Sequence, residues 1–141
     1  MIKISNINLD FNAIKDLNSK IIKCNLCSRL VDFRQEIAFK KRKQFQSWNY
    51  WGKPVPGYGS FSSNLLLTGL APAAHGGNRT GRVFTGDKSA AFLVNCLNKA
   101  GISNQSNSDS LDDGLILNNT YMTAVLKCVP PGDKPKSDEL M

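Results

Sequence analysis

Apolar residues recur at helical spacing near the start of the chain. Through residues 10–27 they stand three or four positions apart, at Phe11, Ile14, Leu17, Ile21 and Ile22. This spacing predicts an amphipathic helix, and Asp10 is suited to cap its N-terminus. Residues 28–63 show no sustained period and carry many basic and turn-forming residues, so we predict an irregular segment there.

Two short apolar runs predict strands. Residues 65–67 are three consecutive leucines, which favours a buried parallel strand, and residues 121–126 form the second run. A helical pattern between them starts near Ser89 and ends at Gly101. Its expected apolar face carries Phe92, Leu93, Cys96, Leu97 and Ala100. The polar and acidic residues 104–114 predict an exposed surface loop.

The order strand, helix, strand is typical of the α/β class with a parallel sheet. The carboxyl ends of two parallel strands meet at one edge of the sheet, so the segments that follow the two strands are expected to share a cleft. A length of 141 residues is enough for one domain with its own core. We therefore expect residues 1–141 to form a single domain with a site at the strand ends.

The segment after the leucine run is a long loop rich in glycine, GLAPAAHGGNRTGRVFTGD over residues 69–87. A loop of this kind between a strand and a helix is where open α/β sheets bind ligands. Phe84 offers a ring for stacking, and Arg79 and Arg82 are expected to offer charge to an anionic ligand. The alternative is a long solvated loop, which is uncommon in compact domains unless it is functional.

The chain is basic, with 18 lysines and arginines against 11 acidic residues, a net charge of +7 and a pI near 9.4. This charge favours a polyanionic partner, nucleic acid first, although solubility alone explains part of it. The run Lys40, Lys41, Arg42, Lys43 precedes several aromatic residues and predicts phosphate contacts; the alternative is a solvated face. No stretch of 18 apolar residues exists, so we expect no membrane span, and the N-terminus has no hydrophobic signal core, so we expect a cytoplasmic protein.

The four cysteines differ in setting. Cys24 and Cys27 form a C-x-x-C pair, a spacing that presents two sulfurs to one metal or cluster. Cys128 lies before a double proline, and Cys96 falls on the expected apolar face of a helix, which predicts a core position. A disulfide is disfavoured in the cytoplasm. Cys24 and Cys27 could also be two unrelated thiols, and no fourth ligand is evident from the spacing.

Taken together, the C-x-x-C pair, the loop of residues 69–87 and the segment KCVPPGDKP of residues 127–135 resemble the iron–sulfur uracil-DNA glycosylases of type b, also called family 5. The resemblance covers residues 20–140. It implies a three-layer αβα sandwich around a central, mostly parallel sheet. It also implies a hydrolase of base excision repair that flips uracil, or another deaminated base, out of DNA and cleaves its N-glycosidic bond.

The resemblance assigns roles to individual residues. Cys24, Cys27 and Cys128 match three of the four cysteine ligands of a [4Fe–4S] cluster. Asp87 and Asp133 match the two polar positions that face the base and the attacked sugar, and are the expected catalytic residues. The expected substrate-binding residues are Gly69, Ala71, Pro72, Ala73, His75, Gly76, Asn78 and Phe84, of which Phe84 stacks on the flipped base.

Some of these positions have a second interpretation. Ala71 stands where other branches of the superfamily carry a carboxylate or amide that orients water, which leaves more of that task to Asp87. Asp87 is also placed to cap the following helix, and Asp133 could be an ordinary turn aspartate. His75 could line the pocket or make a hydrogen bond within the loop.

The resemblance also bears on the extent of the chain. The family's fourth cysteine and its His-Pro-Ser type loop lie beyond the matched motifs, so we expect residues 1–141 to be the N-terminal two-thirds of the domain. On that expectation the sandwich is incomplete, residues 1–141 alone excise little or no uracil, and the complete enzyme is a monomer acting on uracil-containing DNA. Two alternatives are an inactive nucleic-acid-binding remnant and a small redox or zinc module; the module leaves the loop of residues 69–87 unexplained.

Overall fold

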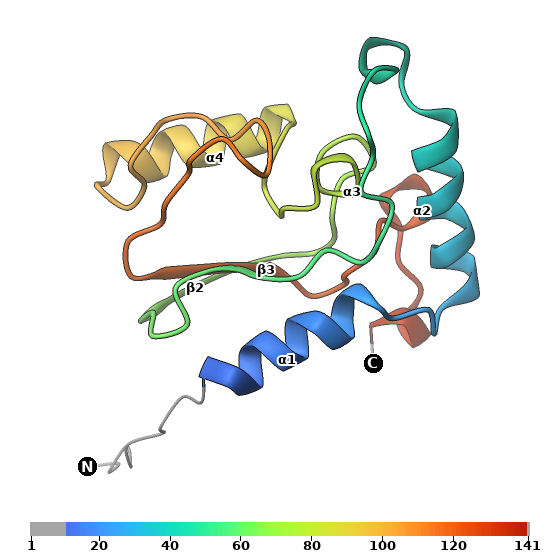
Figure 1. The fold of residues 1–141 in the computed structure, drawn as a ribbon, viewed down its shortest axis with the longest axis horizontal. Coiled ribbons are helices and arrows are strands. Elements are labelled where there is room, and N and C mark those ends of the chain that lie inside the picture. Colours follow the sequence, from blue (N-terminus) through green and yellow to red (C-terminus); the bar gives the residue numbers. More distant parts are fainter. Residues whose placement is uncertain (1–10, 141) are drawn as a thin grey trace.

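The structure is a computed structural model that describes residues 11–140, so the predicted cap at Asp10 lies outside the described residues. Four α-helices, three strands and three short 3₁₀ helices follow one another along this part of the chain (Figure 1). In chain order they are α1 Phe11–Ile22, α2 Ser28–Lys40, η1 Lys43–Phe45, β1 Tyr58–Gly59, β2 Leu65–Gly69, α3 Gly77–Thr80, α4 Lys88–Lys99, β3 Thr120–Ala124, η2 Pro131–Asp133 and η3 Ser137–Glu139.

The strands form a small mixed sheet in the order β1-β3-β2. β2 and β3 are parallel, with Leu65 opposite Thr120 and Gly69 opposite Ala124, whereas β1 is antiparallel to β3. The predicted pair of parallel strands and the α/β class are therefore confirmed. Parallel pairing brings the carboxyl ends of β2 and β3 to the same edge of the sheet.

The hydrophobic core lies between α4 and one face of the sheet, and α1 runs along the opposite side of the sheet (Figure 1). The buried members of the hydrophobic core are Val55, Val83, Val94, Leu97, Leu115, Leu117, Met122 and Ala124. Among residues 11–140, no helix combines the length and the apolar character needed to cross a bilayer.

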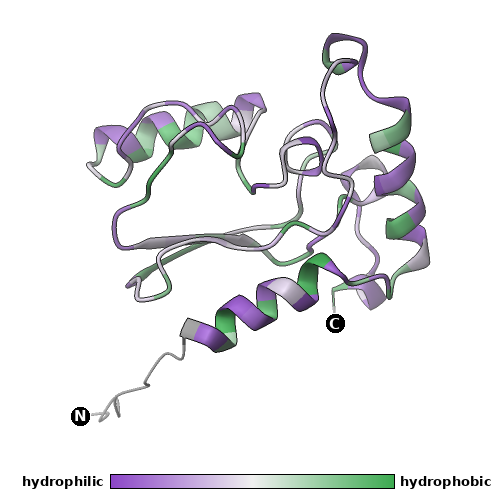
Figure 2. Ribbon diagram, in the orientation of Figure 1, coloured by the Kyte–Doolittle hydropathy of each residue, from purple (hydrophilic) through white to green (hydrophobic). Residues whose placement is uncertain are grey.

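Residues 28–40 form the helix α2, so the prediction of an irregular segment is wrong over this range. Hydrophobic and hydrophilic residues alternate along α2 without a strong stripe (Figure 2). Its buried residues are Leu30 and Arg34, so a charged side chain takes one of the two inward positions. Arg34 donates to Oδ1 of Asn25 over 2.6 Å, which compensates its burial. The predicted first helix ends early, at Ile22, and Cys24 and Cys27 lie in the connection between the two helices.

The predicted apolar face of α4 is wrong in part, since Leu93 and Leu97 pack against the core but the other predicted residues do not. The helix buries Ala90, Val94 and Leu97, whereas Phe92 is 75% exposed and Cys96 is exposed. Leu97 is the only one of the predicted face residues that is fully buried, because the helix is rotated towards its alanine and valine side to pack closely over the sheet.

The leucine run is a parallel strand, as predicted, but it is not buried. Leu65 is 39% exposed and Leu66 is 62% exposed. Leu67 points to the face opposite Leu66 and packs against the core, as the two-residue period of a strand requires. On the Leu66 side of the sheet, Asn18 of α1 donates to the hydroxyl of Tyr121 in β3 over 3.3 Å.

Candidate active site

A cavity of about 870 Å³ lies at the carboxyl ends of β2 and β3, and we call it the strand-end cavity. The loop after β2, the segment after β3 and the turn after α2 all contribute to its wall, which confirms that the two strand ends share a cleft. Its lining residues are Arg42, Gln44, Phe45, Trp48, Ala73, Ala74, His75, Gly76, Arg79, Gly86, Asp87, Lys88, Ala91, Asp109 and Asp133.

Asp87 both caps α4 and lines the strand-end cavity. Its Oδ1 accepts a hydrogen bond from the backbone N–H of Ala90 over 2.9 Å, so the predicted N-cap is confirmed. Its Oδ2 lies directly against Gly76, where a Cβ atom would overlap it. Within residues 11–140, Oδ2 accepts no hydrogen bond. One oxygen therefore holds the helix, and the other is available at the cavity wall because residue 76 is a glycine.

Asp133 reaches the same cavity from the segment after β3. It ends the short helix η2, is exposed, and has a left-handed backbone with φ of 57°. A non-glycine residue in this region is uncommon, although aspartate tolerates it better than most. The structure thus brings the two sequence-predicted carboxylates, 46 positions apart in the chain, to one cavity.

The other predicted substrate-binding residues fall into two groups. Ala73, His75 and Gly76 line the strand-end cavity. The remaining five, which are Gly69, Ala71, Pro72, Asn78 and Phe84, are not among its lining residues. Asn78 is 1% exposed and donates to the backbone oxygen of Arg34 over 3.2 Å, so it ties the loop to α2.

Phe84 packs against the end of β2. A Cβ atom on Gly69 would lie 2.8 Å from Cζ of the Phe84 ring, so only glycine leaves room for this contact. The ring is half-buried beside the hydrophobic core, and its backbone φ is 49°. Ser108 fixes this backbone by donating to the Phe84 oxygen over 2.9 Å, and its own carbonyl accepts from Gly86 N–H over 2.8 Å.

Arg79 is buried, although it also lines the strand-end cavity, so its charge does not lie on an open loop. It is 3% exposed, and its guanidinium carbon lies 3.9 Å from the ring centre of Phe45 and 4.0 Å from that of Trp48. Nε donates to the backbone oxygen of His75 over 2.6 Å, and Nη2 donates to that of Gly86 over 2.8 Å. Arg79 therefore binds both limbs of the loop to the aromatic residues after α2.

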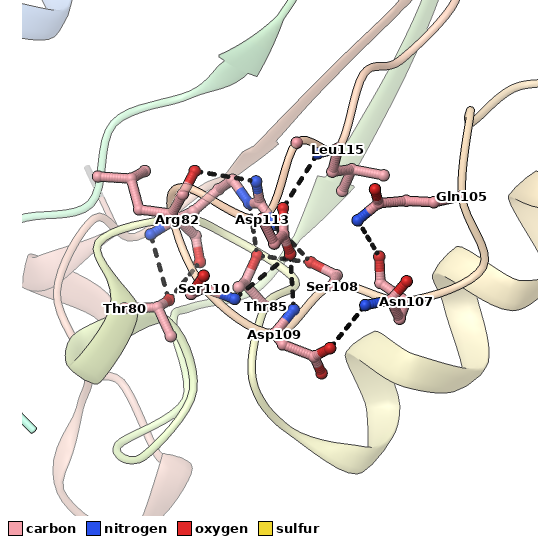
Figure 3. Close-up of polar contacts among 12 residues, drawn as sticks. Thr80, Arg82, Thr85, Gln105, Asn107, Ser108, Asp109, Ser110, Asp113 and Leu115 are labelled. Carbon is pink, nitrogen blue, oxygen red and sulfur yellow. Dashed lines mark hydrogen bonds and ion pairs between the residues drawn. The ribbon is translucent and has the colours of Figure 1, made fainter.

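Arg82 is buried as well, and it pairs within the protein (Figure 3). Its Nη2 lies 2.7 Å from Oδ2 of Asp113, and Nη2 also donates to the Ser108 hydroxyl over 3.0 Å. Burial alone would raise the pKa of Asp113, but hydrogen bonds from Arg82 and from the backbone N–H groups of Asp109, Leu115 and Ser110 lower it to about 2.

This network also corrects the prediction for residues 104–114. They are not simply an exposed loop, because Ser108 is 2% exposed and Asp113 holds Arg82. Sequence patterning missed both partners, since hydrophilic residues in a loop carry no mark of burial. The only signal in the sequence for this pair was opposite charge: arginines in the loop before α4 and aspartates in the loop after it.

His75 lies between the cavity and Tyr50. Its Nδ1 is 3.0 Å from the Tyr50 hydroxyl. Burial lowers the pKa of His75, and the guanidinium groups of Arg42 and Arg79 lower it further. The ring is therefore neutral at pH 7.

Three of the cysteines come together. Cys24, Cys27 and Cys128 are half-buried. Burial raises the pKa of Cys128 to about 11; Arg34 opposes this rise, whereas Cys24 and Cys27 add to it, so the three thiols are close enough to interact. Cys96 is exposed on α4 and was wrongly predicted to be in the core.

The donor chemistry of these three cysteines fits an iron–sulfur cluster, because soft thiolates are its usual ligands. Among the described residues, no three His, Cys, Asp or Glu side chains are placed around a single metal ion. A [4Fe–4S] cluster binds each cysteine at a different iron, so its ligands need not converge on one point. In number and chemistry, the three thiols match three of the four ligands that such a cluster takes.

The four residues of the basic run have different surroundings. Lys40 pairs with Glu36 at 2.5 Å on the surface of α2. Lys41 donates to the backbone oxygen of Trp48 over 2.7 Å and so holds the turn after α2. Arg42 lines the strand-end cavity, and Lys43 is exposed at the start of η1.

Comparison with known families identifies the chain at the superfamily level. The model of the uracil DNA glycosylase superfamily matches residues 56–141, and the chain belongs to this superfamily. The resemblance drawn from the sequence motifs is thereby confirmed.

Curated relatives narrow the class. The chain is 50% identical over 127 residues to a type-5 uracil-DNA glycosylase of Mycobacterium leprae, a match that covers 90% of this chain and 56% of the relative. It is 50% identical over 117 residues to that of Thermus thermophilus (83% and 52% covered) and 44% identical over 125 residues to that of Pyrobaculum aerophilum (89% and 54% covered). The chain thus spans about half the length of these relatives.

Proposed function

We propose that this protein is a uracil-DNA glycosylase, which hydrolyses the N-glycosidic bond between uracil and deoxyribose in DNA. The observation that carries the proposal is the placement of Asp87 and Asp133 at one cavity, with one oxygen of Asp87 unpaired at its wall. The names of the type-5 relatives supply the substrate class. Other deaminated bases are further candidate substrates.

The proposed chemistry assigns a separate task to each group. Cleavage of the glycosidic bond builds positive charge on the sugar and negative charge on the departing base. Oδ2 of Asp87 stabilises the sugar cation and orients the attacking water, while Oδ1 keeps the carboxylate aligned through the cap of α4. Asp133 is the second polar group at the base and sugar.

The target base reaches this cavity by flipping out of the DNA, because enzymes cannot reach an atom stacked inside a duplex. In this proposal Phe84 stacks on the base, and the loop from Gly69 to Asn78 forms the pocket around it. A monomer suffices for this reaction. A three-layer αβα sandwich around the sheet belongs to the same proposal.

Cys24, Cys27 and Cys128 would hold a [4Fe–4S] cluster. When bound, the cluster supplies a cross-link between the connection of α1 to α2 and the segment after β3. Next to this connection, Nη1 of Arg29 in the first turn of α2 pairs with Glu139 of η3 at 2.7 Å.

DNA is proposed to approach over the basic run. Arg42 and Lys43 are the strongest candidates for phosphate contacts, since Arg42 stands at the strand-end cavity and Lys43 is exposed beside it. Lys40 and Lys41 complete the run, although each already has a protein partner.

An excision assay with matched carboxylate variants tests the proposal. The protein, expressed from its complete reading frame, is incubated with an oligonucleotide that contains one deoxyuridine, and abasic product is quantified. Asp87→Asn keeps a good N-cap residue but removes the negative charge, so we expect the single-turnover rate to fall at least about tenfold. The control Asp16→Asn removes an exposed carboxylate of α1 and should keep the full rate. Absence of excision by the wild-type protein, or a full rate in Asp87→Asn, would contradict the assignment.

A further inference from the structure

His75 is the only histidine of the chain, and its ring is held by Tyr50. The two rings meet edge to face, with centroids 6.0 Å apart and planes at 78°. The Tyr50 hydroxyl lies 3.0 Å from Nδ1 of His75. Since Tyr50 is only 7% exposed, its hydroxyl depends on partners within the protein.

The second contact of the Tyr50 hydroxyl decides where its proton goes. The backbone N–H of Arg42 donates to the hydroxyl oxygen over 3.3 Å. A proton on Nδ1 of His75 would leave the hydroxyl accepting twice, with its own proton lacking an acceptor. Donation from Tyr50 to an unprotonated Nδ1 satisfies every group and places the imidazole proton on Nε2.

The remaining ring nitrogen of His75 is available to a ligand in the strand-end cavity. Within residues 11–140, His75 makes no side-chain hydrogen bond other than that to Tyr50. Nε2 lies on the opposite side of the ring from Nδ1, and His75 lines the strand-end cavity. Arg42 and Arg79 also line this cavity, and their positive charges are close enough to His75 to lower its pKa. A positive potential together with a free N–H favours an anionic oxygen.

We propose that His75 is a neutral hydrogen-bond donor whose Nε2–H, fixed by Tyr50, binds an anionic oxygen of the nucleotide substrate. The inference rests on the proposed function for the identity of the substrate, but not for the tautomer. A deoxyuridine nucleotide supplies such an oxygen from two groups: a backbone phosphate, and the uracil anion that leaves the sugar. Tyr50 is a positioning residue, because it acts through His75.

The tautomer is measured by long-range ¹H–¹⁵N correlation spectra of the tag-free, ¹⁵N-labelled 141-residue chain. A single histidine makes both ring nitrogens assignable without ambiguity. At pH 7 we expect a protonated Nε2 and an unprotonated Nδ1. Tyr50→Phe should give a mixture of tautomers, whereas Tyr121→Phe, which removes a hydroxyl bonded to Asn18, should change nothing. Amide spectra of each variant verify that it folds, and a protonated Nδ1 in the wild type would overturn the proposal.

Separate titrations with inorganic phosphate and with uracil identify the oxygen. A shift of the Nε2 resonance with phosphate assigns the backbone phosphate, and a shift with uracil assigns the base. For the effective probe, His75→Leu should weaken binding about tenfold, and His75→Gln, which retains an N–H donor, should restore part of it. An Nε2 resonance that responds to neither probe would overturn the proposal. A third outcome is the expected tautomer and a phosphate response in a protein that excises no uracil. This outcome would contradict the proposed function but support the present inference.

Discussion

The loop between β2 and α4 and the strand β2 that precedes it reverse the usual relation between polarity and burial. Residues 76–83 are glycines and polar residues with a single valine, yet all of them are buried. Leu65 and Leu66 of β2 are aliphatic, yet they are 39% and 62% exposed. Polar residues of the loop are thus buried as core residues usually are, and apolar residues of the strand are exposed as surface residues usually are.

The difference shows that burial here follows hydrogen-bond satisfaction as well as hydropathy. Arg79 and Arg82 lie inside because carbonyl, hydroxyl and carboxylate acceptors or aromatic rings surround them. Leu66 lies on the face of the sheet turned away from the core, and residues 11–140 leave most of its side chain in solvent.

The largest expected effect comes from breaking the charge pair that supports the loop. Arg82→Met leaves Asp113 buried without its counter-ion, and we expect the free energy of unfolding to fall by about 3–5 kcal/mol. Urea unfolding followed by circular dichroism measures the loss. Lys40→Met, which breaks the exposed pair with Glu36, should cost no more than about 0.5 kcal/mol. Equal losses in the two variants would show that the loop is not held by its buried charges.

The same pair predicts a dependence of stability on pH. The folded-state pKa of Asp113 is lowered from 3.8 to about 2, so its contribution is complete above about pH 4 and is lost as the pH falls towards 2. Asp113→Asn should remove this part of the acid sensitivity, visible as a flatter plot of Tm against pH between these limits. An unchanged slope in the variant would assign the acid sensitivity to other carboxylates.

The exposed strand gives the smallest effect on stability and a distinct effect on association. Leu66→Lys should change the free energy of unfolding by no more than about 0.5 kcal/mol, because the side chain is already in solvent. We expect the exposed leucines of β2 to promote self-association of the 141-residue chain, and Leu66→Lys to weaken it about tenfold, since a lysine on an open strand opposes pairing. Sedimentation velocity over a range of concentrations measures this. Ile116→Lys, at a residue 66% exposed outside β2, is the matched control; an equal change there would mean that the β2 surface has no special role.

The sequence predicted those features that depend on residues near one another in the chain. The leucine run predicted β2, and Asp87 predicted the start of α4, because both signals are local. The convergence of Asp87 and Asp133 followed from parallel strand ends together with the family motifs.

The errors arose where distant partners decide the structure. α2 was missed because Arg34 takes an inward position that hydrophobic periodicity counts as polar. The burial of Arg82 was missed because Asp113, its partner, lies 31 positions away in a loop that looks solvated. Leu66 was predicted to be buried because the pattern of a strand cannot show which of its faces is covered.

The stacking of Arg79 on Phe45 and Trp48 links the turn after α2 to the loop after β2, and all three residues also line the strand-end cavity. Both rings come from the turn after α2, about thirty positions upstream of Arg79, and Arg79 in turn holds the backbones of His75 and Gly86. Variation in that turn would tilt the guanidinium and adjust the loop by small steps without replacing a residue of the loop. Selection can therefore tune the shape of this cavity through the turn after α2 as well as through the loop itself.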